Sequence, residues 1–236
     1  MFEKRIGQAQ KLVQVVEERL WIPLKVWLRS EGGNLYHFPY GYEVHMSEEV
    51  KQFLVKFRDS TSIFIRFIPD YVLGLERKER KVVYLLEYKS MTTPRWTEGD
   101  NQWNVGQVEA DAWENYMRLI DIGINVVLFV YCSYHRRPLL MDFPRHDFIY
   151  RKRQETKYTE TGSGTPYYNI DLMKIRSVDR FLEEELSIPC EVFMPYLLDT
   201  LKAIGSEELL QTRHDKRSEY KNVKIEWEIP KCKGLY

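Results

Sequence analysis

The sequence predicts an α/β fold, in which helices flank a mixed β-sheet and further helices follow in the C-terminal third. Two apolar segments, residues 62–76 and 81–90, are separated by a single strongly polar turn, which is typical of a β-hairpin. Residues 105–123 then carry apolar side chains at helical spacing. Residues 124–134 form a continuous apolar run, as in strands that are covered on both faces.

The N-terminal part is predicted to hold two helices. Apolar side chains at helical spacing predict the first over residues 2–20, and Pro23 either ends it or restarts the chain. Residues 26–44 contain several glycines and a proline and are predicted to be irregular. Ser47, followed by two glutamates, is a typical N-cap for a second helix that runs to about Arg58.

The C-terminal part is predicted to decorate the sheet. Residues 137–143 and 167–175 are expected to be strands, and the polar, basic segment 151–167 a long loop or flap. Further expected elements are helices over 177–186, 192–204 and 206–221 and an edge strand over 222–229. We interpret residues 1–236 as a single domain with its core at about 47–132 and additions over 133–236.

The composition narrows the class of protein. The chain has 236 residues, of which 44% are hydrophobic and 30% charged, which is typical of a globular protein. The formal net charge is zero, so a protein that coats nucleic acid is disfavoured, although a nucleic-acid enzyme is not. No signal-peptide core, membrane-spanning apolar run, nucleotide-binding P-loop or nucleophile elbow is found in the sequence.

The chain contains three cysteines, which are Cys132, Cys190 and Cys232. An odd number without a CxxC pair argues against a disulfide framework, a zinc site and an iron–sulfur cluster. We therefore expect a protein of the reducing cytoplasm that has no membrane partner.

The hairpin turn predicts how the two strands pair. If the turn is centred between Lys78 and Glu79, residues whose numbers sum to 157 face each other, so Asp70 lies opposite Glu87. Directly opposed residues of an antiparallel pair share a face of the sheet, with Cβ atoms about 4.5–5.5 Å apart. Lys89, two residues beyond Glu87, shares that face. The prediction depends on the register, because a slip of one residue would separate the three side chains.

Two carboxylates that lie this close repel each other unless a cation lies between them. A bound Mg²⁺ ion, which Mn²⁺ can replace, would meet this requirement, since Mg²⁺ is commonly held by one or two carboxylates. Lys89 would then orient or deprotonate a water molecule or stabilise the charge of the reacting phosphate. The alternative is an ion-pair cluster on a solvated sheet face, but both strands are apolar and buried charges are costly unless they are paired or metal-bound.

The pattern of Pro69–Asp70, sixteen intervening residues and then Glu87–Tyr88–Lys89 resembles the signature of the PD-(D/E)XK nuclease superfamily, which includes restriction endonucleases, junction resolvases and repair nucleases. In that family the acid lies on one strand, ExK on the next, and a helix and an apolar strand follow. The resemblance implies a restriction-endonuclease-like fold, in which Asp70 and Glu87 bind the metal and Lys89 assists the attacking water. It also implies that the main-chain carbonyl of Tyr88 is a further ligand.

Members of the family also place polar residues on the helices around this motif. A glutamate from the helix before the first core strand often joins the site, and the candidates are Glu17, Glu18, Glu48 and Glu49. Each of them is otherwise a solvated helix residue. A glutamine or lysine often lies on the helix after ExK, and Gln107, expected in the first turn of that helix, matches; otherwise it is a surface residue.

Residues that contact nucleic acid are expected on two segments. The loop after Lys89 carries Arg95, Trp96 and Trp103, and a tryptophan there either stacks on a base or packs against the sheet. The basic run Arg151–Arg153, which includes Lys152, begins the predicted flap and either binds phosphates or is a solvated turn.

The resemblance thus implies a Mg²⁺-dependent deoxyribonuclease, an endonuclease of restriction, defence or repair, that acts on double-stranded DNA as a homodimer. One alternative is a non-catalytic nucleic-acid-binding or assembly subunit that retains the nuclease fold. A second alternative is an RNA or single-strand nuclease that uses the same site.

Overall fold

The computed structural model describes residues 10–41, 46–56, 59–78, 80–91, 102–154, 166–205, 227–230 and 232. Its α-helices are α2 (Ile22–Ser30), α4 (Glu48–Val55), α5 (Ser60–Arg66), α6 (Ala110–Asp121), α7 (Val178–Glu184) and α8 (Cys190–Ile204). Residues 10–16 are also helical. The chain further contains a π-helix, η1 (Glu17–Trp21), and the 3₁₀ turns η2 (Gln102–Asn104), η3 (His146–Phe148) and η4 (Leu172–Lys174). No helix in the described ranges is long and apolar enough to cross a membrane.

The strands form two sheets. They are β1 (Asn34–Pro39), β2 (Tyr71–Arg77), β3 (Arg80–Met91), β4 (Val105–Glu109), β5 (Val126–Cys132), β6 (Leu139–Asp142), β7 (Ile149–Gln154) and β8 (Tyr167–Asp171). The larger sheet has the order β1-β2-β3-β5-β6, and the smaller has the order β4-β8-β7. Only the β3–β5 pair is parallel, so the larger sheet is mixed, as predicted.

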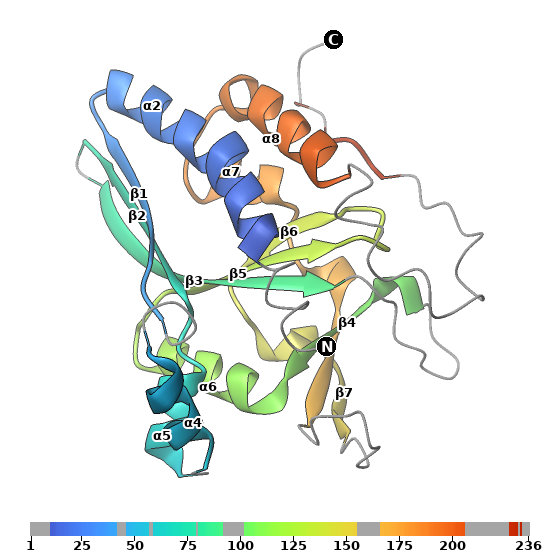
Figure 1. Ribbon diagram of the computed structural model, residues 1–236. Helices are drawn as coiled ribbons and strands as arrows, with labels where there is room; N and C mark the ends of the chain where they lie inside the picture. The colour runs from blue at the N-terminus through green and yellow to red at the C-terminus, as the bar shows by residue number, and fades with distance from the viewer. Residues whose placement is uncertain are drawn as a thin grey trace.

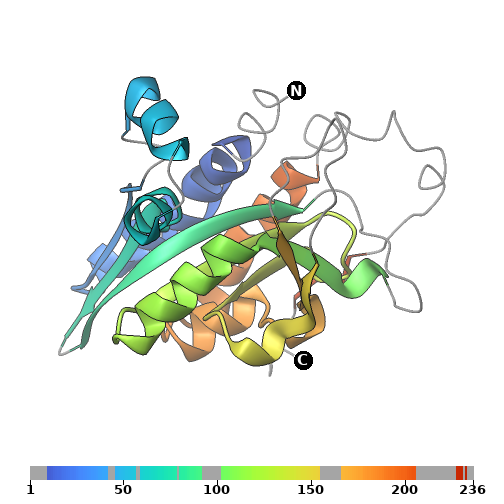
Figure 2. The same ribbon diagram turned by 90° about the horizontal axis from the view of Figure 1, so that it is seen from below.

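Helices cover the larger sheet on both faces (Figures 1 and 2). One face packs against α2, α7 and α8, and the other against α6 and the smaller sheet. Two hydrophobic cores result: the first lies between the sheet and α2, α7 and α8, and the second between the sheet and α6 with the smaller sheet. Strand β5 is buried at every position, because Val127 and Phe129 point into the first core while Val126 and Leu128 point into the second. This confirms the prediction that the apolar run is covered on both faces.

The predicted hairpin register is confirmed. Val72 pairs with Leu85 and Gly74 with Val83, so the numbers of opposed residues sum to 157. Lys78 adopts a positive φ of 47° in the turn, at the predicted centre. The hairpin is therefore symmetric about that turn, as its polar sequence indicates.

The first predicted strand is shorter than expected, because residues 60–66 form helix α5 and not a strand. The side chain of Asp59 caps this helix by accepting hydrogen bonds from the amides of Thr61 and Ser62. An Asp side chain at this position satisfies donors that have no partner within the helix. The cap thus outweighs the strand preference of the Ile and Phe side chains, and extended structure begins only at Tyr71.

Strand β1 lies in the segment that was predicted to be irregular. It pairs with β2 at the edge of the larger sheet, so the sheet begins well before residue 47. Pro39 ends the strand, which is a position that an edge strand tolerates because proline donates no hydrogen bond to the ladder. Gly32, which has a φ of 76°, forms the turn that leads into the strand.

The N-terminal helix does not end at Pro23. Residues 10–16 are helical, the chain widens into η1, and α2 then continues to Ser30 with Pro23 in its first turn. Proline cannot donate to the carbonyl four residues earlier and clashes with it. A local widening before proline accommodates this defect, and such π-turns often occur at functional sites.

Two later predictions are also wrong in part. Residues 105–109 form β4, so the following helix begins at Ala110. The start of the predicted flap is strand β7, which pairs with β8, and residues 155–165 lie outside the described part. The helix predicted over 206–221 lies outside it as well, and residues 227–230 carry no strand. The helices predicted over 177–186 and 192–204 are present as α7 and α8.

A disulfide joins Cys190, at the start of α8, to Cys232, with Cα atoms 5.6 Å apart. The expectation that the chain forms no disulfide is therefore wrong. The two residues are separated by 42 positions, so sequence spacing does not reveal that they meet. Cys132 remains a free and buried thiol in β5, and burial raises its pKa to about 12.

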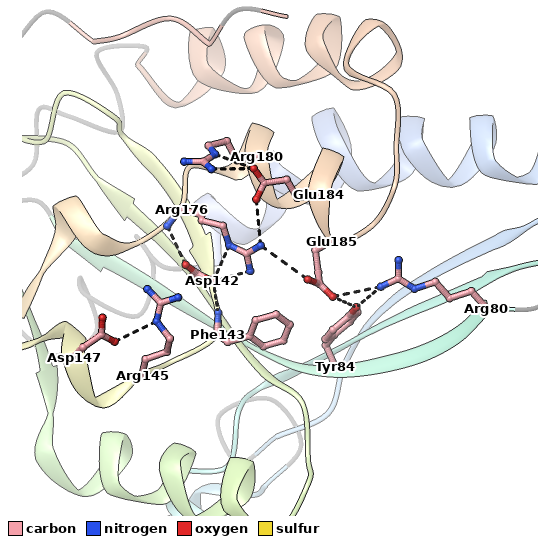
Figure 3. A network of polar contacts seen from close by, with 10 residues as sticks. All are labelled: Arg80, Tyr84, Asp142, Phe143, Arg145, Asp147, Arg176, Arg180, Glu184 and Glu185. Atoms are coloured by element: carbon pink, nitrogen blue, oxygen red, sulfur yellow. Dashed lines mark hydrogen bonds and ion pairs between the residues drawn. The ribbon is translucent and has the colours of Figure 1, made fainter. Parts of the chain in front are cut away.

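A buried ion pair fastens β6 to the segment before α7 (Figure 3). Asp142 is 1% exposed, and its Oδ1 accepts from Nε and Nη2 of Arg176 at 2.8 and 2.7 Å. The backbone amides of Phe143 and Arg176 also donate to this carboxylate. Glu185, at the end of α7, extends the network to the hairpin through Arg80 and the hydroxyl of Tyr84.

We predict that Asp142→Asn lowers the free energy of unfolding by about 1.5–3 kcal/mol, because it weakens the charge-assisted hydrogen bonds that hold Arg176 to β6. Glu184 and Glu185, at 3.6 and 3.9 Å, remain as anionic partners of the Arg176 guanidinium. Urea denaturation of the variant and the wild type measures the change. Asp147→Asn is the matched control, since Asp147 forms an exposed pair with Arg145 that contributes less than about 1 kcal/mol. Equal losses in the two variants would contradict the buried network.

We also predict that reduction of the Cys190–Cys232 bond lowers the free energy of unfolding by about 4 kcal/mol. The bond closes a loop over 42 positions, which restricts the unfolded chain by about that amount. Urea denaturation with and without a thiol reductant measures it. The double variant Cys190→Ser/Cys232→Ser should show no effect of the reductant, and the same effect in both proteins would contradict the prediction.

Candidate functional site

Asp70, Glu87 and Lys89 come together on the face of the larger sheet that α6 covers. Asp70 immediately precedes β2, whose first residue, Tyr71, pairs with Leu86, so the register extended by one position sets Asp70 opposite Glu87. Alternate residues of β3 point to opposite faces, and Tyr84 and Leu86 point into the first core. Glu87 and Lys89 therefore point to the other face, as the sequence predicted.

The bend that carries Asp70 is held from two sides. Asn115 of α6, itself buried, donates to the carbonyl of Phe67 at 3.0 Å. The amides of Tyr40 and Gly41 donate to the carbonyl of Asp70 at 2.7 and 3.0 Å. Contacts from α6 and from the end of β1 thus fix the backbone around the predicted metal ligand.

Gly41 allows this close approach. A Cβ atom at Gly41 would lie 2.6 Å from Oδ1 and 2.7 Å from Cα of Asp70. These separations are shorter than real Cβ contacts, so any side chain at Gly41 displaces the bend. Glycine is required here because the backbone of one segment packs directly against the side chain of the other.

Glu87 is 7% exposed and accepts from two directions. Its Oε1 lies 2.6 Å from Nζ of Lys89, and its carboxylate also hydrogen-bonds the hydroxyl of Tyr116. Burial disfavours the charge of Lys89, but Glu87, together with Tyr116 and Glu109, outweighs burial, so the pKa of Lys89 is well above its ordinary value. The buried carboxylate is thus charge-paired.

Two residues of this cluster were not predicted from the sequence. Burial, followed by the nearby Glu87 carboxylate, raises the pKa of Tyr116 well above its ordinary value, and Asp70 contributes in the same direction. The carboxylate of Glu109, at the N-cap of α6, helps to raise the pKa of Lys89. Tyr116 fits the apolar spacing of its helix, and this spacing predicts a core position. The spacing gives no sign that the hydroxyl group reaches Glu87.

The opposite face of β3 carries a second polar network. Trp21 Nε1 donates to the hydroxyl of Tyr88 at 2.7 Å, and Nε2 of His37 lies 2.9 Å from the same hydroxyl. Nδ1 of His37 contacts the carboxylate of Glu17. The ring of Tyr71 stacks on His37 with centroids 5.1 Å apart. Burial, the first cause, raises the pKa of Tyr88 well above its ordinary value.

The four candidate glutamates differ in position. Glu17 lies on η1 and contacts His37 of β1. Burial first, then Asp70 and then Glu17 raise the pKa of Tyr71. Glu18, Glu48 and Glu49 are exposed. Glu17 is therefore the only one of the four whose carboxylate is turned toward the sheet, and it lies on the face opposite to Glu87 and Lys89.

Gln107 was expected in the first turn of a helix, and this is wrong. It lies in β4, where its Nε2 donates to Oδ1 of Asn169 on β8 at 3.0 Å. The helix begins only at Ala110, so Gln107 belongs to the small sheet. The strand-like alternation of residues 105–109 was hidden by the helical spacing of the residues that follow.

The expected contacts with nucleic acid are described only in part. Trp103 is half-buried and packs against the second core, which agrees with the alternative that a tryptophan of this segment packs against the sheet. Arg95 and Trp96 lie outside the described residues, and so do the side chains of Arg151, Lys152 and Arg153. The backbone of those three basic residues belongs to β7 and not to a loop.

The backbone of β3 presents one more oxygen at this position. The amide of Leu85 donates to Asn125, the residue before β5, so the backbone groups of Leu85 point toward β5. Alternate residues point the opposite way, so the carbonyl of Tyr88 points toward β2. Tyr88 lies beyond Leu86, the last β3 residue that pairs with β2, so this carbonyl faces the side on which Asp70 lies.

The donor set fits a Mg²⁺ ion. Two carboxylates and a main-chain carbonyl, completed by water, are ligands that Mg²⁺ accepts. In the described part of the chain, no group of three or more His, Cys, Asp and Glu side chains is arranged to hold a metal. Glu17 thus does not form a third carboxylate ligand in this conformation.

Comparison of the chain with protein-family models, curated proteins and solved structures finds no match. The candidate site is therefore supported by its residues and their geometry alone.

We predict that Gly41→Ala lowers the free energy of unfolding by about 1–3 kcal/mol, the usual cost of overpacking, because the new methyl group displaces the Asp70 bend. Gly74→Ala is the control, since its Cβ would meet Cβ and Cδ2 of Tyr36 at 3.3 Å, a contact that a shift of a few tenths of an ångström relieves. Urea denaturation compares the two. A loss in Gly74→Ala that equals or exceeds that of Gly41→Ala would refute the prediction.

Proposed function

We propose that the protein is a metal-dependent nuclease of the PD-(D/E)XK type. The observation that carries the proposal is the hairpin register: beyond its last pair, Tyr71 with Leu86, the next opposed positions are Asp70 and Glu87, and Lys89 pairs with Glu87. A buried carboxylate inside an otherwise apolar hairpin is costly unless it is paired or bound to a metal, so Glu87 and its neighbours require an explanation.

The connectivity of the sheet supports the proposal. The acid precedes β2, ExK lies on β3, helix α6 follows, and β5 then pairs in parallel with β3. This order matches the core that the sequence resemblance implies. In that comparison the helix before the first core strand is the one that carries Glu17, since β1 precedes β2 in the sheet.

In the proposed site Asp70, Glu87 and the carbonyl of Tyr88 would hold Mg²⁺. The metal supplies an activated water and neutralises charge on the scissile phosphate when it is bound. Lys89 lies against Glu87, where its ammonium orients the carboxylate and attracts the phosphate. Tyr116 and Asn115 of α6 hold the carboxylate and the bend in place, so the acidic residues are positioned before substrate binds.

We propose DNA as the substrate and a role in restriction, defence or repair, as the resemblance implies. A homodimer remains an expectation from the same source, since each site cuts one strand.

A second candidate function is a non-catalytic nucleic-acid-binding or assembly subunit. The observation that favours it is the Glu87 carboxylate, which is already paired with Lys89 and hydrogen-bonded to Tyr116. On this reading the ion pair alone accounts for the buried charges and no metal is needed.

The proposed nuclease is tested by incubating the protein with plasmid, single-stranded circular DNA and RNA, each with Mg²⁺ or Mn²⁺. We predict cleavage of at least one substrate. Asp70→Asn and Glu87→Gln should each reduce the cleavage rate by more than about 100-fold. Residues that only support a metal ligand typically contribute roughly 10- to 100-fold, and loss of a ligand itself should cost more. Asp199→Asn, on α8 in an exposed ion pair with Arg19 of η1, is the matched carboxylate-to-amide control and should retain activity.

Two results would contradict this prediction. Cleavage that survives Asp70→Asn would assign the activity to another site or protein. Intact substrates throughout, together with calorimetry that detects no Mn²⁺ binding dependent on Glu87, would favour the non-catalytic alternative.

A further inference from the structure

Three aromatic side chains, two on the edge strand β1 and one just beyond its end, are exposed in a row. Tyr36, Phe38 and Tyr40 are 43%, 47% and 49% exposed. They alternate along β1 with Leu35 and His37, which are buried on the opposite face. An edge strand with large apolar side chains in contact with solvent is unusual, because such edges associate readily with other chains or ligands.

The register shows where this row leads. Tyr36 pairs with Gly74 of β2, and Phe38 with Val72. The backbone amide of Tyr40 donates to the carbonyl of Asp70, so the next step of the row reaches the candidate metal ligand. The three aromatic side chains thus lie on the same face of the sheet as Asp70 and Glu87 and end beside them.

This part of the sheet face is not covered by α6. Leu85 packs against the second core, but Val83, two residues away on the same face, is 60% exposed. Val83 pairs with Gly74, which in turn pairs with Tyr36. The part of the sheet face that α6 covers therefore ends between Leu85 and Val83, and the row of aromatic side chains lies on the exposed part of this face.

The ring of Tyr36 is held against the sheet. A Cβ atom at Gly74 would meet Cβ and Cδ2 of Tyr36 at 3.3 Å, so the tyrosine packs over the glycine. Its hydroxyl donates to Glu76 at 3.3 Å. The glycine provides the space in which the ring lies, as in aromatic rescue of a sheet glycine.

Resting on the proposed function, we propose that Tyr36, Phe38 and Tyr40 form a platform on which single-stranded nucleic acid stacks its bases as it enters the Asp70–Glu87 site. Exposed aromatic rings beside a reaction centre bind single strands without sequence preference, because every base has a π-face. On this proposal the substrate is a single strand or an unpaired segment, and not the double-stranded DNA that the resemblance implies.

The spacing of the row favours a single strand over a duplex. Residues two apart in a strand lie about 6.6–6.8 Å apart, roughly twice the 3.4 Å per nucleotide along one strand of a duplex. A chain that places successive bases on these rings must be stretched and unstacked. Bases in a duplex expose only their edges, so they cannot reach the rings with their faces.

Binding is measured with a fluorescent 20-nucleotide oligothymidylate and a 20-base-pair blunt duplex, in EDTA so that neither is cut. Wild-type protein should bind the single strand more tightly than the duplex. Phe38→Leu should weaken binding of the single strand about fivefold or more, as expected for the loss of one stacked base. Phe38→Tyr, which keeps the ring, should retain the wild-type affinity.

Val83→Ala is the matched control, because Val83 is exposed on the same face but carries no ring. It should leave binding unchanged. The slope of affinity against salt concentration should be the same for Phe38→Leu and the wild type, since stacking releases no counterions. Far-UV circular dichroism shows that the variants are folded.

The outcomes separate this proposal from the nuclease proposal. If Phe38→Leu binds and cuts single strands as the wild type does, the platform is wrong while the nuclease stands. If no substrate is cut but Phe38→Leu loses single-strand binding, the platform stands and the nuclease is wrong. A wild-type dimer that Phe38→Leu converts to a monomer, with no change in oligonucleotide binding, assigns the face to self-association and overturns the platform.

Discussion

The pairing of β3 with two different neighbours is the constraint on which the rest of the structure depends. On one side β3 forms an antiparallel hairpin with β2, and on the other it runs parallel to β5. The hairpin sets the register that brings Asp70 opposite Glu87, while the crossover through α6 brings Asn115 and Tyr116 over the same residues. A change in the hairpin register would separate the two carboxylates, and a change in the β3–β5 pairing would move the α6 side chains away from them.

The central strand carries polar groups on both faces, and each is satisfied in a different way. Glu87 and Lys89 neutralise each other beneath α6. Tyr88, between them, points to the other face and is held by Trp21 and His37. Because neighbouring residues of one strand serve both networks, the segment that would position a metal is anchored from above and below the sheet.

Coverage of the sheet decides where ligands can approach. Helices α2, α7 and α8 close one face along its length, and the ion pair of Asp142 with Arg176 fastens β6 to the segment before α7 (Figures 1 and 3). On the other face α6 covers β3 and β5 but leaves part of β1 and β2 open. The open part adjoins the candidate site, which is why its exposed aromatic rings are informative about substrate.

The sequence by itself determined the hairpin, its register and the shared face of Asp70, Glu87 and Lys89, because a polar turn between two regular strands specifies which residues are opposed. It also determined that β5 is buried on both faces. Local patterns misled where a cap or a proline outweighed them, as at Asp59 and Pro23. Tertiary structure alone decided that Gly41 packs on Asp70, that Tyr116 reaches Glu87 and that Cys190 meets Cys232. These contacts join segments far apart in the chain, and alternation within one strand or helix carries no information about which distant residue lies across the interface between layers.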